Sequence, residues 1–255
     1  MEISLIHIIS SMLIIGLRVS GLMLFAPFFG SAVIPPRIKA VLVIAITSVL
    51  YPVYSPHLHV VTMAQWPLLV ASETVVGIAL GVATNAVFEG AQMAGQVLSV
   101  QMGYSLVNIL DPLTQVDSTV VAFFHQSLAM LIFLGLDVHH WILRAVANSF
   151  DYLPPGSATL NPLFLQALLH EGAIVLDLGI QIAAPVLSAT LLADIVLGLM
   201  GKASPQMPLM LMGPAVKSML GVLVLSVTLR FWPHLFARYF AESIAYAEHL
   251  LHLAR

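Results

Sequence analysis

Long apolar blocks, separated by short breaks, run along the whole chain. Proline, glycine or isolated charged residues mark most of the breaks. The blocks cover approximately residues 3–28, 40–52, 66–99, 118–150, 161–200 and 214–232, and a more polar helical tail follows to residue 255. A helix needs about 20 apolar residues to cross the hydrocarbon core of a bilayer, and five or six blocks approach that length. Because the polar–apolar alternation of a membrane barrel is missing from these blocks, the pattern predicts an all-α membrane protein.

Two blocks begin with residues that are typical of a helix start. Asn161 followed by Pro162 is typical of an N-cap with proline in the first turn. Asp117 and Ser118 offer capping side chains for a single helix that we expect to run to about residue 150.

Composition narrows the class of protein further. Of 255 residues, 60% are hydrophobic and only 8% are charged, and the mean hydropathy is +1.00. Soluble domains carry about 25% charged residues, so a water-soluble enzyme and a disordered chain are both excluded. The net charge of −3 offers no basic field for nucleic acid. With no cysteine, the chain has no disulfide and no thiolate site.

Charged residues inside the apolar blocks raise a question about lipid contact. Arg18, Glu73, Asp177 and Asp194 interrupt the blocks, and each costs roughly 2.5–3.5 kcal/mol near a bilayer centre. A six-span topology also leaves four Lys or Arg on each side, which gives no positive-inside signal. Either the charges line a polar pathway, or these helices lie against protein, and we favour protein contact.

Polar residues form a stripe on the third predicted helix. At 100° per residue they fall within about 80° of one another. They are Asn85, Glu89, Gln92, Gln96 and Ser99. Such a stripe does not suit hydrocarbon, so it predicts either a water-filled or protein-lined conduit or interhelical hydrogen bonds.

The stripe leads into an apolar, charge-poor segment at residues 101–117. Gly103 can break the helix, and Asp111-Pro112 indicates a turn or helix start. Irregular backbone at membrane depth is tolerated only inside protein or along a cavity, so a plug or constriction loop is one hypothesis and an ordinary connector is the other. The candidate plug or pore residues are Gln101, Met102, Gly103, Tyr104, Leu106, Val107, Asn108, Ile109, Leu110, Asp111 and Pro112.

A methionine-rich stretch is the candidate tip of a helical hairpin. Its methionines, which give a deformable apolar surface, are Met207, Met210 and Met212. Lys202 and Lys217 flank the stretch. A pair between Asp194 and Lys202, or between Lys217 and a carboxylate, would hold the hairpin shut.

The ten histidines suggest no metal site at the sequence level. His139 and His140 are adjacent and should point about 100° apart on a helix. His249 and His252 share a face, but no third ligand stands at zinc-site spacing. We assign no catalytic residue, metal ligand or cofactor from the sequence.

An ordered set of motifs resembles the FliR family of flagellar biosynthesis proteins. The set spans about residues 27–217 in the family order. The motifs are PFFG (27–30), IPPRIK (34–39), ETVVGIALG (73–81), QMAG (92–95), QMG (101–103), DP (111–112), LDVHH (136–140) and SPQM (204–207).

The resemblance implies a structural subunit that helps to form and close the pore of the flagellar type III export gate. FliP and FliQ subunits would be its partners in a helical multi-subunit assembly, with FlhB, FlhA, exported flagellar proteins and membrane lipid as further partners, and no nucleic acid. The location implied is the bacterial inner membrane, in the flagellar basal body. Residues 1–160 would form a FliP-like part containing a plug loop at 101–117, and residues 161–255 a FliQ-like helical hairpin and tail. Leu106, Val107, Ile109 and Leu110 would then supply an apolar seal.

Two alternatives stay open at this point. One is an ion- or solute-coupled membrane transporter that uses Glu89, Asp177 and Asp194 as relay groups. The other is the homologous export-gate subunit of a virulence (injectisome) system.

Overall fold

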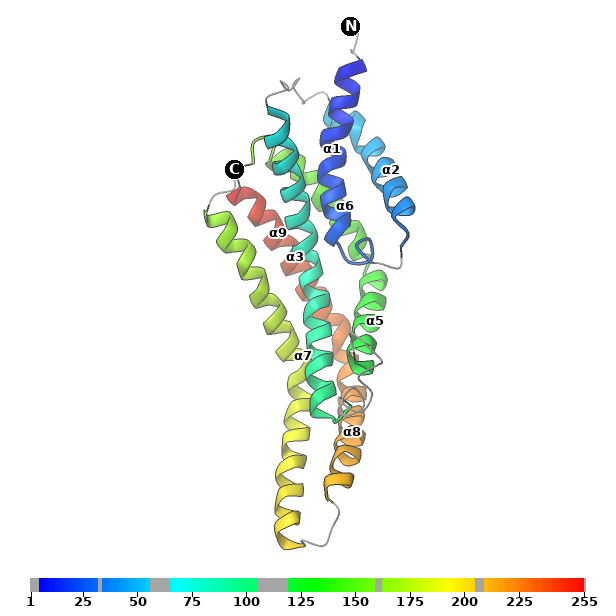
Figure 1. Cartoon of the computed structure of the whole chain (residues 1–255), viewed down its shortest axis with the longest axis vertical. Helices are drawn as coiled ribbons and strands as arrows, with labels where there is room; N and C mark the ends of the chain where they lie inside the picture. The colour runs from blue at the N-terminus through cyan, green and yellow to red at the C-terminus, as the bar shows by residue number, and fades with distance from the viewer. Residues whose placement is uncertain are drawn as a thin grey trace. The chain divides into compact units, whose positions relative to one another are not determined.

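The computed structural model describes residues 5–31, 34–55, 65–104, 119–158, 162–204 and 209–254, among which there are helices and turns and no strand (Figure 1). The expected all-α class is confirmed. The helices are α1 (Leu5–Phe25), α2 (Pro36–Tyr54), α3 (Trp66–Gln101), α5 (Val120–Gly135), α6 (Val138–Tyr152), α7 (Pro162–Ala203), α8 (Leu209–Thr228) and α9 (Trp232–Leu253), and a 3-10 turn at Leu229–Phe231 links the last two.

Several helices have the length and apolar character of membrane spans. Within the described part of the chain there are five, or six if α5 and α6 together count as one broken span. The sequence expectation of five or six spanning blocks is therefore confirmed in length and composition.

The chain folds into two compact units, each assembled from separated segments. The first contains Met1–Ala86, Asp137–Gly172 and Phe240–Arg255, and the second contains Val87–Leu136 and Ala173–Tyr239. These boundaries differ from a division at residue 160, and the FliP-like and FliQ-like assignment stays a prediction.

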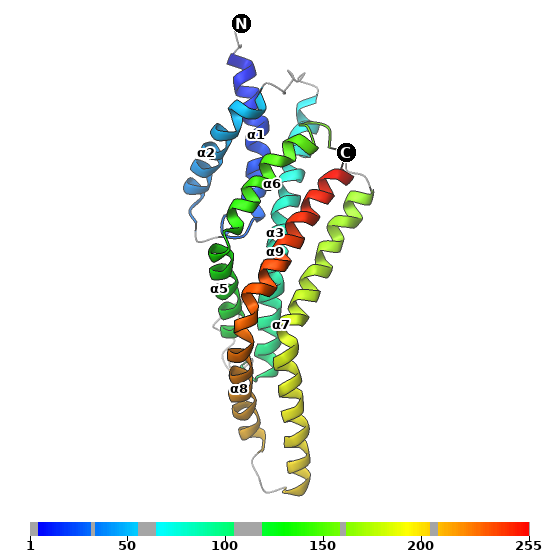
Figure 2. The same ribbon diagram turned by 180° about the vertical axis from the view of Figure 1, so that it is seen from behind.

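Small residues bring α1 and α3 close together in the first unit. A Cβ at Gly21 would lie 2.6 Å from the Thr74 carbonyl oxygen, and one at Gly81 would lie 2.9 Å from that of Leu22. Gly77 faces the Arg18 carbonyl oxygen at still closer range. Close helix contact through small residues is typical of membrane helices. Helix α2 lies beside α1, and Thr47 is its one buried residue (Figures 1 and 2).

A buried ion pair forms the polar centre of the first unit. Arg18 Nε donates to Glu73 Oε2 at 2.8 Å, and both side chains are 0% exposed. The guanidinium also donates to Ser149 Oγ at 3.1 Å and to the Leu153 carbonyl oxygen at 3.0 Å. Glu73 Oε1 accepts the Gly156 N–H at 2.9 Å. In the sequence, Arg18 and Glu73 appeared only as charges that interrupt two different apolar blocks. In the structure they neutralise each other inside the protein.

In the second unit, the C-terminal half of α3 packs against α5 and α7. A Cβ at Gly90 would lie 3.1 Å from the Leu178 side chain, and Gly95 faces the α5 backbone at Ala122. The rings of Phe88 and Phe133 meet edge to face at 5.5 Å. Figure 2 shows α7 and α8 side by side as the predicted hairpin.

Two expected helix boundaries are wrong. The single helix over residues 118–150 is two helices, because Asp137 takes a left-handed φ of 55° directly after Gly135-Leu136. The first of them is capped by Thr119, whose Oγ1 accepts the Ala122 N–H at 3.2 Å.

The final apolar helix also begins earlier than expected, at Leu209, with Pro214 inside it. Pro214 lies in the second turn of α8, where proline removes one backbone hydrogen bond and favours a kink, and the helix nevertheless continues to Thr228.

Candidate functional site

Only the first four residues of the predicted plug, Gln101 to Tyr104, belong to the described part of the chain. The others lie outside the described residues, so the constriction itself stays a prediction. They are Leu106, Val107, Asn108, Ile109, Leu110, Asp111 and Pro112. The structure does describe how the segment leaves α3, and we call residues 101–104 the root of the central segment.

A Schellman motif ends α3 at the root. Gly103 has a φ of +86°, which is the left-handed region that favours glycine. Its N–H bonds to the Val100 carbonyl at 3.1 Å, and the Tyr104 N–H bonds to that of Ser99 at 2.9 Å. These are the paired bonds that close a helix with glycine just beyond its last turn. The expectation that Gly103 breaks the helix is confirmed.

Helix α8 holds the root through main-chain and side-chain contacts of Met102. The Met102 carbonyl oxygen accepts a hydrogen bond from Ser218 Oγ at 2.8 Å. The Met102 side chain is buried and fills the space left by Gly221, where a Cβ would lie 2.6 Å from Met102 Cε. A Cβ at Gly103 would in turn lie 3.0 Å from Pro214 Cβ. The first residues of the segment therefore sit directly on α8.

Gln101 joins the root to an ion pair within the hairpin. Lys217 Nζ lies 3.0 Å from Asp194 Oδ1, and Gln101 Nε2 donates to Asp194 Oδ2 at 3.1 Å. The Lys217 and Asp194 side chains are 19% and 42% exposed. The sequence suggested two possible ion pairs. The pair between Lys217 and a carboxylate is present, with Asp194 as the partner, and Asp194 therefore does not pair with Lys202.

The predicted hairpin tip is only partly described. Met207 and the side chain of Met210 lie outside the described residues, whereas Met212 and Lys202 are both exposed. Lys217 lies eight residues after the start of α8, so it belongs to the shaft of the hairpin.

The polar stripe of α3 is divided between surface and interior. Glu89 and Gln96 are exposed, and Asn85 and Gln92 are half-buried. Ser99 is buried, and its Oγ has no hydrogen-bond partner among the described residues. Exposed polar groups on a largely apolar helix fit either a conduit or hydrogen bonds to another helix, and both remain predictions.

The carboxylates of the alternative transporter relay hold separate partners. Asp177 accepts hydrogen bonds from the Tyr239 hydroxyl and from Gln181 Nε2. Asp194 is held by Lys217 and Gln101. The described contacts therefore do not join Asp177 and Asp194 into one hydrogen-bonded chain.

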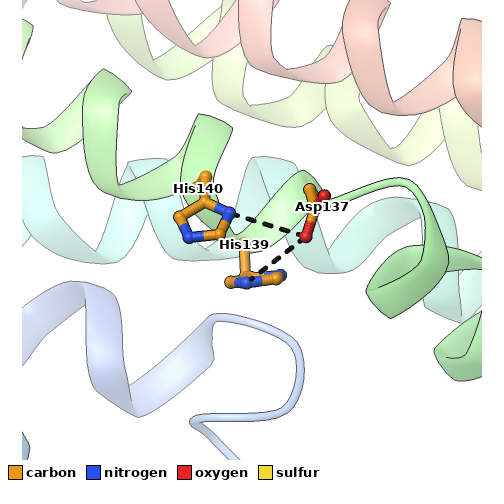
Figure 3. A group of neighbouring side chains, drawn as sticks. All are labelled: Asp137, His139 and His140. Atoms are coloured by element: carbon orange, nitrogen blue, oxygen red, sulfur yellow. Dashed lines mark ion pairs between the residues drawn. The ribbon is translucent and has the colours of Figure 1, made fainter.

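The expectation that the two adjacent histidines diverge is wrong. The ring centroids of His139 and His140 lie 4.1 Å apart, and both rings turn toward the Asp137 carboxylate (Figure 3). They stand in the first turn of α6, where no preceding helical turn restricts their long side chains. An ideal helical wheel therefore does not predict where their nitrogens lie.

Some residues that shape the site gave no usable sequence signal. Ser218 and Gly221 lie more than 100 positions from Met102, which they contact. Likewise, Arg18 and Glu73 are 55 positions apart. The one available signal was the presence of opposite charges inside apolar blocks, which does not identify which charges pair.

Large apolar surfaces remain uncovered on several helices. Exposed side chains of this kind on α7 are Leu176, Ile180, Leu191, Ile195 and Leu199. Apolar grooves of about 430 Å³ and 390 Å³ lie between α1 and α2 and between α7 and α8. Surfaces of this extent mark contacts with lipid or with another protein.

Comparisons with known proteins agree with the motif pattern. Residues 9–243 match the family described as "Bacterial export proteins, family 1". The chain is 28% identical over 229 residues to the flagellar biosynthetic protein FliR of Escherichia coli (strain K12). The matched region covers 88% of this chain and 87% of the relative. It is 26% identical to FliR of Bacillus subtilis (strain 168), with 88% of each chain covered. The chain is similar to FliR proteins over about 88% of its length, and since the family match covers residues 9–243, the chain belongs to bacterial export proteins, family 1.

Proposed function

We propose that this chain is a structural, pore-forming subunit of a flagellar type III protein export gate. The observation that carries the proposal is the match to bacterial export proteins over residues 9–243, together with relatives named flagellar biosynthetic protein FliR. Those names favour the flagellar system over the virulence counterpart. The role is not enzymatic, since it consists of building a passage and closing it.

The root of the central segment supports a closing role. Met102 and Gly103 are fixed on α8, and Gln101 is tied to the ion pair of Asp194 and Lys217. A segment that begins from a rigid attachment has one defined starting point and direction. Leu106, Val107, Ile109 and Leu110 follow within seven residues, and together they would form an apolar constriction that excludes ions by dewetting.

The uncovered apolar helices support assembly with other helical subunits. Helix α2 buries one residue within this chain, and α7 exposes apolar side chains along much of its length. FliP and FliQ subunits are the partners we propose for these faces, with FlhB and FlhA as neighbours in the same apparatus. The gate would lie at the bacterial inner membrane, in the flagellar basal body, and would pass unfolded flagellar proteins.

A serine replacement of the proposed seal tests this function. Cells that lack their own copy of the gene would produce this chain with Leu106, Val107, Ile109 and Leu110 changed to Ser. We expect a several-fold increase in ion leak at unchanged protein level, together with altered export of filament protein. A matched control changes Leu58, Val60, Val61 and Met63 to Ser, in the connection between α2 and α3. The proposal is wrong if both variants show wild-type conductance and export.

A further inference from the structure

Three potential metal ligands meet where α5 ends and α6 begins. His139 Nε2 lies 3.9 Å and His140 Nδ1 lies 3.6 Å from the same oxygen, Asp137 Oδ1 (Figure 3). One donor atom from each of the three side chains lies within 4.8 Å of the other two. We propose that Asp137, His139 and His140 form an open binding site for a divalent transition-metal ion, with Zn²⁺ as the test ion.

The backbone at Asp137 directs its carboxylate toward the imidazoles. Asp137 has φ 55° and ψ 28°, a left-handed conformation that Asp tolerates better than most residues. An aspartate at an N-cap ordinarily accepts a backbone N–H of the first helical turn, but this side chain makes no such bond. The Asp137 main-chain carbonyl instead accepts the His140 N–H at 2.9 Å. The carboxylate therefore stays available as a ligand.

The donor set suits a transition metal better than Mg²⁺ or Ca²⁺. Two imidazoles and one carboxylate are typical ligands of Zn²⁺, whereas Mg²⁺ and Ca²⁺ prefer all-oxygen sites. Zinc bonds of about 2.0–2.2 Å place tetrahedral donors about 3.3 Å apart. The donors here lie 3.6 Å, 3.9 Å and at most 4.8 Å apart, so binding requires each pair to close by roughly 0.3–1.5 Å. Three protein ligands leave a fourth position for water.

The exposures of the three side chains permit this closure. Asp137 and His140 are 70% and 65% exposed, so their side chains can move and an ion can enter. His139 is 27% exposed and is the more firmly held ligand. Two imidazoles 4.1 Å apart would repel each other if both were protonated. A metal ion binds them in their neutral form and balances the Asp137 charge.

Zinc titration of the purified full-length chain in detergent tests the site. The protein is first treated with a chelator, and binding is then measured by calorimetry. We expect one Zn²⁺ per chain at this site, and at least a ten-fold loss of affinity in Asp137→Asn and in His140→Gln. Asparagine also tolerates the left-handed conformation, so Asp137→Asn keeps the backbone while weakening the ligand. Mg²⁺ at the same concentration should not compete.

A matched control and a second readout make the outcome decisive. His249→Gln/His252→Gln removes another pair of closely spaced histidines, at the end of α9, and should leave this binding unchanged. Cu²⁺ should quench the fluorescence of Trp141, which follows His140 directly, and the quenching should be lost in Trp141→Phe and in His140→Gln. Circular dichroism of each variant checks that it is folded. The site is refuted if folded Asp137→Asn/His140→Gln binds Zn²⁺ like the wild type, or if the wild type binds none at millimolar Zn²⁺.

Discussion

Among the residues that the structure describes, two ion pairs join helices, and they differ in burial and in the groups that they hold in place. Arg18 and Glu73, in the first unit, are both 0% exposed and are surrounded by further hydrogen bonds and by the Phe150 ring at 4.2 Å. Lys217 and Asp194, in the second unit, are 19% and 42% exposed.

Because of this difference in burial, we expect the Arg18–Glu73 pair to stabilise the fold and the Lys217–Asp194 pair to position a neighbouring segment. Breaking a fully buried pair leaves an uncompensated charge away from water, and that cost is large. A half-exposed pair contributes little to the free energy of unfolding, because water solvates the partner that remains. Since Asp194 also binds Gln101, at the end of α3, its pair with Lys217 acts on the root of the central segment. We therefore expect the first pair to govern whether the chain folds, and the second to govern how the segment is held.

The largest expected effect is in the first unit. Arg18→Met should destabilise the protein by about 3–5 kcal/mol, because Glu73 would remain buried without its cation. Thermal unfolding in detergent and the protein level in cells both measure this loss. Arg18→Met/Glu73→Met removes both charges and should recover part of the stability. If Arg18→Met unfolds at the wild-type temperature, the buried pair is not the polar centre we describe.

A smaller effect is expected where Met102 meets α8. Gly221→Leu should destabilise the second unit by about 1–3 kcal/mol, since the new side chain would displace buried Met102. Gly198→Leu, on the same hairpin, is the matched control, because a side chain there meets open space. Unfolding temperatures of the two variants provide the comparison, and equal values would contradict the proposed fit of Met102 against Gly221.

The hydrogen bond from Ser218 to the root should contribute less still. Ser218→Ala removes the donor to the Met102 carbonyl and should cost about 0.5–1.5 kcal/mol. Ser226→Ala, which removes a local and exposed hydrogen bond to the Leu223 carbonyl within α8, serves as the control. Chemical denaturation with matched baselines resolves a difference of this size. No difference between the two variants would mean that the Ser218 bond does not fix the root.

The sequence predicted those features that depend on local pattern. The lengths of the apolar blocks predicted most of the helices, and Gly103 predicted the end of α3. Opposite charges on the hairpin predicted the pair of Lys217 with a carboxylate as one of two possible pairings. Features that depend on tertiary contacts could not be predicted from the sequence. Nothing near Arg18 in the sequence points to Glu73 or Ser149, because helix packing alone brings them together.

The break between α5 and α6 was missed for a different reason. Residues 118–150 are apolar enough for a single helix, and Gly135 alone is a weak breaker in such a context. The left-handed Asp137 decides the outcome, and asparagine or aspartate adopts that conformation only as an exception. The same local geometry brings together the imidazoles that an ideal helix would separate.

Ion leak in cells that carry Lys217→Met, measured together with the amount of the protein, tests the division between the two ion pairs most directly. Stability should change by less than about 1 kcal/mol, so the protein level should match the wild type. Leak should rise several-fold, because Asp194 and Gln101 would no longer be fixed against α8. A wild-type leak at normal protein level would contradict the account, and so would a fall in protein level comparable to that of Arg18→Met.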